Sequence, residues 1–236
     1  MSRKFLGLFL VFFFCATSLV FAEKIRPLQV SIWSPVQLVS ASNSIAGLRF
    51  NLVYTDNKDV SGISLGAGWA RTGGGMKGIE LGAVNWTDGL TYGFKSGFLN
   101  YTGRRSVGLD LAAINIIKGE MTGFQAGIAN YNYDALHGWE LGFVNYINGR
   151  FIGIQNGFLN IIEGDLSGLQ TGIINSVNGA MTGLQLSLFN YAASSNGLQL
   201  GLFNTTNSLG GLQLGLSNYA GPNAPIEWCP FVNWSF

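Results

Sequence analysis

A 15-residue repeat runs through almost the whole chain and limits its possible folds more than any other feature. Each unit reads Gly, apolar, polar, any residue, a small residue, two apolar residues and Asn, as in Gly153–Asn160. The leading glycine recurs at positions 47, 62, 78, 93, 108, 123, 138, 153, 168, 183, 197 and 211, which are 15 residues apart except for one spacing of 16 and two of 14. Degenerate units at 27–35 and 226–234 bring the array to about 14 units. The repeat therefore predicts one domain over residues 23–236.

Within each unit, apolar residues alternate with glycine and polar residues. Leu198, Leu200 and Leu202, for example, are separated by single Gly or Gln residues. A period of two is typical of a β-strand and not of a helix. Dipeptides such as Asp88-Gly89 and Asn148-Gly149 separate neighbouring units, and they favour tight turns between strands. The sequence therefore predicts an all-β protein.

We predict that these strands form an antiparallel meander closed as an outer-membrane β-barrel. One unit supplies a strand of about 9–11 residues, the length that a transmembrane strand needs, and 14 is an even number, as in bacterial barrels. Residues 166–226 contain no charged side chain, which favours contact with lipid. In this prediction the Leu, Ile and Phe residues face lipid and the Gln residues line the interior.

A parallel β-solenoid with one coil per unit is the alternative. Identical residues would then stack along the rod as an Asn ladder and a Gln ladder, which explains why each unit carries the same residue at the same place. In a meander, by contrast, the Asn residues alternate between the two rims. Units of equal length also supply no register stagger, which barrel closure requires. The sequence leaves the choice between these two folds open.

The first residues predict export. Arg3 and Lys4 precede an apolar run at 5–14, and Val20-Phe21-Ala22 resembles a cleavage site, so residues 1–22 are predicted to be a secretory signal peptide. Lipidation at Cys15 is an alternative, although Phe14 is a poor residue before a lipidated cysteine. Removal of residues 1–22 leaves Cys229 as the single cysteine, so a disulfide framework within one chain is excluded.

Candidate chemistry is sparse. His137 is the only histidine and is expected to be an exposed residue of an irregular turn, so neither a His/Cys metal site nor a Ser-His-Asp triad is expected. Glu80, Asp110 and Glu140 occupy the polar third position of their units, with Lys95 among them. We interpret these residues as a polar lumen or solvated strip. A net charge of +1 argues against a nucleic-acid groove. We predict a protein with no catalytic, cofactor-binding or metal-binding residues.

The Gly-Leu-Gln-x-Gly-x-x-Asn unit resembles a bacterial surface-repeat family best known from leptospiral surface proteins. The resemblance covers 27–236, including the opening Pro27, Gln29 and Ser31 and the ending at 230–236. It implies a surface location in a Gram-negative-type bacterium and brings no catalytic residues.

We therefore predict a non-enzymatic outer-membrane protein with a structural or pore-like role. Its expected partners are outer-membrane lipid and, through Trp234 and Phe236, the outer-membrane assembly machinery. A secreted or surface-attached solenoid that acts as an adhesin or interaction scaffold is the alternative function.

Overall fold

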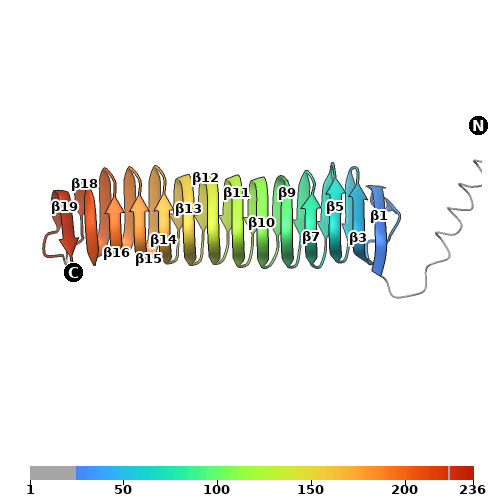
Figure 1. Cartoon of the computed structure of the whole chain (residues 1–236), viewed down its shortest axis with the longest axis horizontal. Helices are drawn as coiled ribbons and strands as arrows, with labels where there is room; N and C mark the ends of the chain where they lie inside the picture. Colours follow the sequence, from blue (N-terminus) through green and yellow to red (C-terminus); the bar gives the residue numbers. More distant parts are fainter. Residues whose placement is uncertain (1–24, 223) are drawn as a thin grey trace, which may run out of the picture.

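The computed structural model describes residues 25–222 and 224–236, and every helix or strand element in them is a β-strand. The coils follow one another along a straight rod (Figure 1). The strands are β1 (Ile25–Trp33), β2 (Val36–Gln37), β3 (Ser44–Asn51), β4 (Tyr54–Asn57), β5 (Val60–Gly66), β6 (Trp69–Thr72), β7 (Met76–Leu81), β8 (Val84–Thr87), β9 (Thr91–Thr102), β10 (Ser106–Ile117), β11 (Met121–Asn132), β12 (Leu136–Ile147), β13 (Phe151–Ile162), β14 (Leu166–Thr171), β15 (Ile174–Leu186), β16 (Phe189–Leu200), β17 (Phe203–Leu209), β18 (Gly211–Tyr219) and β19 (Trp228–Ser235).

Neighbouring coils are parallel and in register, so the predicted antiparallel barrel is wrong and the fold is a parallel β-solenoid. Gly108 of β10 pairs with Gly123 of β11, and Asn115 pairs with Asn130. The same one-to-one pairing continues through β12 and β13. The Asp-Gly and Asn-Gly dipeptides form corners between coils and do not form hairpins: Gly89 N–H donates to Gly74 O across the coil boundary (2.9 Å).

The repeat predicts nearly the right number of coils, but it does not predict how the chain folds at the C-terminal end of the array. Each of the twelve leading glycines belongs to one coil, and β1 adds another before them because it pairs in parallel with β3. At the usual strand spacing, thirteen coils make a rod of roughly 60 Å. The degenerate unit at 226–234 does not form a further coil. It contains most of β19, which runs antiparallel to β18.

In ten of the twelve units, the leading glycine has a positive φ that other residues rarely adopt. The φ angles of Gly123, Gly138 and Gly153 lie between 133° and 141°. A Cβ on Gly138 would also lie well inside contact distance of the Gly123 carbonyl oxygen in the preceding coil. The close approach of the preceding coil recurs at all twelve leading glycines, including Gly197 and Gly211, which have no positive φ, and it explains why this position is glycine throughout.

The interior contains an apolar core between columns of polar side chains. Ten buried residues form the main apolar cluster: Ile117, Met121, Leu136, Ile147, Phe151, Ile162, Leu166, Val177, Met181 and Ala192. The predicted alternation is confirmed, because the Gln and Asn columns face inward while most Leu, Ile and Phe residues of the repeat face solvent. The interior is packed with side chains, so the expected polar lumen is wrong.

The predicted signal peptide at 1–22, including Cys15, lies outside the described residues. Within the described part of the chain, no helix has the length and apolar character needed to cross a membrane.

Candidate functional site

An asparagine ladder runs along one side of the interior. Each side chain donates from Nδ2 to Oδ1 of the next asparagine toward the C-terminus, as Asn130 does to Asn145 and Asn145 to Asn160 (both 2.8 Å). The same Nδ2 group reaches a backbone carbonyl of the next coil, such as Asn156 O for Asn145 (2.9 Å). The members are Asn85, Asn100, Asn115, Asn130, Asn145, Asn160, Asn175, Asn190, Asn204 and Asn218.

A second amide ladder runs in the opposite direction. Gln170 donates from Nε2 to Oε1 of Gln155, and Gln185 donates to Gln170 (both 2.8 Å). The series continues through Gln199 and Gln213. Both ladders bond one coil to the next, so they hold the coils in register and leave little hydrogen-bonding capacity for a ligand.

Toward the N-terminus the glutamine column is replaced by charged side chains. Arg49 Nη2 lies 2.6 Å from Glu80 Oε1, and Lys95 Nζ lies 3.9 Å from Glu80 Oε2. One coil further, Ser106 Oγ donates to Asp110 Oδ2 (2.7 Å). Burial lowers the pKa of Arg49 and of Lys95 despite the neighbouring Glu80, and it raises the pKa of Asp110 despite Lys95.

The sequence correctly places Glu80, Lys95, Asp110 and Glu140 in one column, but these residues do not form a solvated strip. Each is at most 2% exposed. Neutral acceptors complete the shell of Lys95, whose Nζ donates to Tyr101 O (2.8 Å) and to Thr102 Oγ1 (3.2 Å). A substrate cannot reach these groups while the coils are closed, so their role is to join coils.

Glu140 ends the glutamine ladder as an acceptor. Its Oε2 accepts from Gln155 (2.7 Å) and its Oε1 from Asn132 (2.8 Å). Burial raises the pKa of Glu140 from 4.5 to about 8, although the two hydrogen bonds oppose that rise. The protonated carboxyl therefore stabilises the fold fully below pH 4.5, the ordinary pKa of glutamate. This stability falls as the pH rises further and is lost once the pH passes the folded-state pKa of about 8.

We expect Glu140→Gln to remove this loss of stability, because an amide does not ionise in this range and its oxygen can still accept from Gln155. The wild type and the variant should have similar urea midpoints at pH 4. The variant should become more stable by up to about 1.4 kcal/mol for each pH unit between the two pKa values. Urea unfolding at pH 4, 6, 8 and 9 measures the difference. Glu227→Gln, at an exposed position, is the control. A constant difference between Glu140→Gln and wild type across this range would contradict the prediction.

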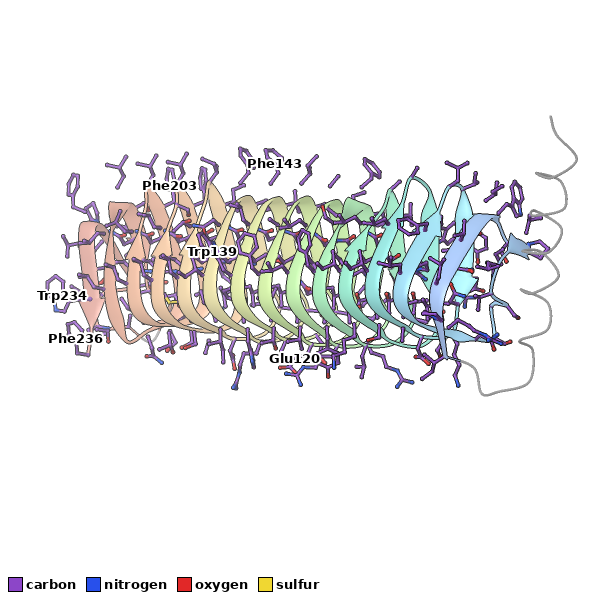
Figure 2. The ribbon with its side chains drawn as sticks, turned by 45° about the vertical axis from the view of Figure 1, so that its right-hand side comes forward. Glu120, Trp139, Phe143, Phe203, Trp234 and Phe236 are labelled. Carbon is purple, nitrogen blue, oxygen red and sulfur yellow. The ribbon has the colours of Figure 1, made fainter. Side chains whose placement is uncertain are left out.

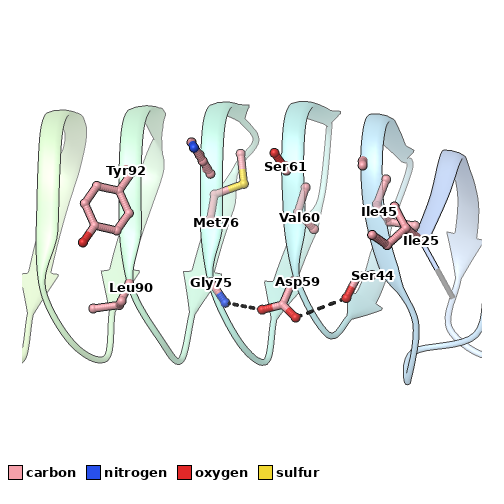
Figure 3. Close-up of a pocket in the computed structure, with 12 residues that line it drawn as sticks. Ile25, Ser44, Ile45, Asp59, Val60, Ser61, Gly75, Met76, Leu90 and Tyr92 are labelled. Atoms are coloured by element: carbon pink, nitrogen blue, oxygen red, sulfur yellow. Dashed lines mark hydrogen bonds between the residues drawn. The ribbon is translucent and has the colours of Figure 1, made fainter. Parts of the chain in front are cut away.

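The remaining candidates near the surface do not assemble a reactive site. His137 lies on β12, not in the expected turn, and its Nδ1 is 3.5 Å from Glu120 Oε1. Figure 3 shows a shallow groove near the N-terminal end, lined by residues such as Ile45 and Tyr92. Its carboxylate, Asp59, already accepts from Ser44 Oγ (3.1 Å) and Gly75 N (2.8 Å). No cluster of three metal-ligating side chains occurs in 25–222 or 224–236.

Over residues 88–165 the exterior is divided lengthwise into apolar and charged parts, whereas residues 166–226 carry no charge. The sixth position of nine consecutive units forms a row that we call the apolar ridge: Phe98, Ala113, Ile128, Phe143, Phe158, Ile173, Leu188, Leu202 and Leu216. Seven of the nine, all except Ala113 and Ile173, are 40–65% exposed. Phe143 and Phe158 stack with ring centroids 4.8 Å apart.

Charged side chains gather along the corner opposite the ridge. We call this row the charged edge: Asp88, Arg104, Arg105, Lys118, Glu120, Asp134, Arg150, Glu163 and Asp165. Figure 2 shows Glu120 on the side of the rod opposite Phe143. Ion pairs join adjacent coils here, including Arg105 with Glu120 (3.5 Å) and Arg150 with Asp165 (3.7 Å). The positions on either side of the ridge, four and seven, carry no charge in any of the twelve units.

These features define the chain as a parallel β-solenoid with an amphipathic exterior and an interior crosslinked by amide ladders. Comparisons with protein-family models, with curated proteins and with solved structures gave no match. The resemblance to the leptospiral surface-repeat family stays a prediction.

Proposed function

We propose that this chain is an exported, non-enzymatic scaffold that lies along the outer surface of a bacterial outer membrane. The apolar ridge contacts lipid, and the charged edge faces water. The division of the rod into these two sides carries the proposal. The solenoid fold supports a surface scaffold and gives no support to a pore.

The shape and chemistry of the ridge favour lipid over a protein partner. Nine coils at the usual strand spacing give a straight row of about 40 Å, which can lie flat on a bilayer. Protein interfaces normally combine an apolar centre with a polar rim and regular hydrogen bonds, and ridge side chains provide no such groups. Burial of each large ridge side chain in lipid would contribute on the order of 1–2 kcal/mol. An amphipathic helix binds the membrane interface in a comparable way.

Flotation with phosphatidylcholine vesicles tests the proposal. The wild type should float with the vesicles, whereas the triple variant Phe98→Ser, Phe143→Ser and Phe158→Ser should remain at the bottom of the gradient. The matched control is Lys118→Ser, Glu120→Ser and Arg150→Ser on the charged edge, which should float like the wild type. Circular dichroism verifies that each variant retains its strands. Failure of the wild type to float, or equal flotation of the ridge variant, would overturn the proposal.

The predicted contact of Trp234 and Phe236 with the assembly machinery stays a prediction. Figure 2 shows both side chains at the C-terminal end of the rod. They lie on and just beyond β19, which adds an antiparallel strand to a solenoid and does not close a barrel.

A further inference from the structure

A flat apolar surface lies between the ridge and the charged edge. The second residue of every unit is apolar, and none of these twelve side chains is buried. Equivalent residues lie side by side from coil to coil, as Phe124 does with Trp139. Figure 2 shows Trp139 on the side of the rod between Phe143 of the ridge and Glu120 of the charged edge. We call this row, the second residues of the units from 48 to 212, the flat face.

The flat face has the size and composition of a stable protein interface. Eleven coils at the usual strand spacing are about 50 Å long, and the stretch from the residue before the glycine to the fourth residue of a unit is roughly 17 Å wide. These dimensions correspond to roughly 900 Å², compared with about 800 Å² per partner in a typical stable complex. The residues just before the leading glycines supply a polar rim, for example Tyr92, Thr122 and His137. An apolar centre with a polar rim is the usual anatomy of a protein interface.

Charged side chains border the flat face in a fixed order. Arg105 Nη2 lies 3.4 Å from Thr122 Oγ1, and Glu120 Oε1 lies 3.5 Å from His137 Nδ1, so this part of the charged edge adjoins the polar rim. Backbone hydrogen bonds connect the same position to the neighbouring coils. Along the rod this position is occupied by Arg105, Glu120, Ala135, Arg150 and Asp165. The order of charges is plus, minus, neutral, plus, minus, and reversal about the neutral position replaces every charge by its opposite.

We propose that two copies of this chain pack antiparallel through their flat faces, about a two-fold axis that crosses both rods at the coil of Trp139. This axis places Arg105 opposite the partner's Asp165. It also places Glu120 opposite the partner's Arg150, and symmetry repeats both pairs. A slip of one coil in one direction would oppose Arg105 to the partner's Arg150. A slip in the other direction would oppose Glu120 to the partner's Asp165, so the charges fix the register of the two rods.

The order of charges selects a second copy as the occupant of the flat face. A partner has to present minus, plus, neutral, minus, plus at intervals of one coil, about 4.8 Å, beside an apolar surface. The reversed rod presents this series by symmetry, whereas a lipid surface has no fixed order of charges. On the axis coil itself, the carboxylate of Asp134 turns back onto its own chain, where Oδ1 accepts from Ala135 N (2.8 Å).

The same axis brings the apolar rows together near the middle of the array. Gly138 is the seventh of the twelve leading glycines, and Trp139 faces its symmetry mate at the centre, where tryptophan residues commonly contribute most to binding. Stacked sheets lie about 10 Å apart, a gap that long side chains from opposite rims can span. Because the axis crosses the rods, both ridges lie on one side of the dimer and both charged edges on the other. The dimer therefore leaves the ridges free and does not rest on the proposed membrane contact.

Molar mass in lipid-free buffer tests the pairing independently of the membrane proposal. Multi-angle light scattering should give twice the mass of one chain for the wild type. Trp139→Lys places a charge at the centre of the interface and should raise the dimer dissociation constant at least about 10-fold. Phe189→Lys is the matched control: the two side chains are 48% and 46% exposed, but Phe189 lies beyond the ridge, outside the flat face. A monomeric wild type, or an equal effect of the two lysines, would overturn the proposal.

A charge swap tests the register. Glu120→Arg opposes like charges at two places in the dimer and should raise the dissociation constant at least about 10-fold. Arg150→Glu, added to Glu120→Arg, restores opposite charges across the interface but leaves like charges within each chain, next to Arg105 and Asp165. The dissociation constant should return to within about 3-fold of the wild type. If these residues act only within one rod, the double variant will be worse than the single one, and that result would overturn the proposal.

Small-angle X-ray scattering of the unmutated protein separates this dimer from end-to-end association. Two rods packed along their length should double the mass while the maximum dimension stays near that of one rod, about 60 Å. Two rods joined at their ends would give about 120 Å. A dimension near the larger value would contradict lateral pairing even if Trp139→Lys fails to fold.

Discussion

Gly138→Ala is expected to lower the free energy of unfolding by at least about 3 kcal/mol. Alanine at φ 141° costs about 1–3 kcal/mol in backbone strain alone. The added Cβ also meets the carbonyl oxygen of Gly123, and that carbonyl is part of the backbone and cannot rotate away. Relief of this steric clash requires the two coils to move apart, and that movement weakens the hydrogen bonds on both sides of the glycine. Urea unfolding followed by circular dichroism measures the effect.

Gly73→Ala is the control for this substitution. A Cβ at Gly73 would have Asn57 O as its nearest neighbour at 3.9 Å, an ordinary contact, and Gly73 has no positive φ. We expect a change of less than about 1 kcal/mol. Equal midpoints for Gly138→Ala and wild type would show that the leading glycine is not required by the stacking of coils.

The sequence predicts which way side chains face but not how strands pair. The alternation at Leu198, Leu200 and Leu202 places these residues outside in both a barrel and a solenoid, because the period of two is a property of the strand alone. Pairing depends on contacts between residues 15 positions apart. Dipeptides such as Asp88-Gly89 are compatible with either a hairpin or a solenoid corner. The informative signal is the glycine at the start of every unit, since parallel coils alone bring all of these glycines into one row.

The burial of the charged column is equally hard to predict locally. The nearest cation in the sequence, Lys77, lies three residues before Glu80 and therefore on the opposite face of the strand, so the local sequence predicts a solvated carboxylate. Its partners, Arg49 and Lys95, are brought to it by the stacking of coils. The reversal of β19 also escapes the repeat pattern, because 226–234 retains part of the repeat spacing while the loop before it allows the chain to turn back.

Glu80→Gln is expected to destabilise the N-terminal coils by about 3–5 kcal/mol at pH 7, the usual cost of leaving a buried charge without its partner. The substitution preserves the shape of the side chain but removes the carboxylate between Arg49 and Lys95. The Arg49 guanidinium still donates to Ser64 Oγ (2.8 Å) and Thr72 Oγ1 (3.1 Å), but neutral oxygens do not compensate a buried cation. Urea unfolding measures the loss, with Glu163→Gln on the charged edge as the control.

The double variant Glu80→Gln with Arg49→Met distinguishes loss of charge balance from loss of packing. Removing Arg49 as well as the Glu80 charge leaves Lys95 with Asp110 and restores a balanced interior. We therefore expect the double variant to be more stable than Glu80→Gln alone, since replacement of a buried ion pair by apolar groups is often neutral, whereas removal of one partner is costly. If the two losses simply add, the cluster acts through side-chain shape, and the charges at Arg49 and Glu80 are not coupled. A recovery in the double variant would show that the charges of Arg49 and Glu80, which lie two coils apart, are energetically coupled and join these coils.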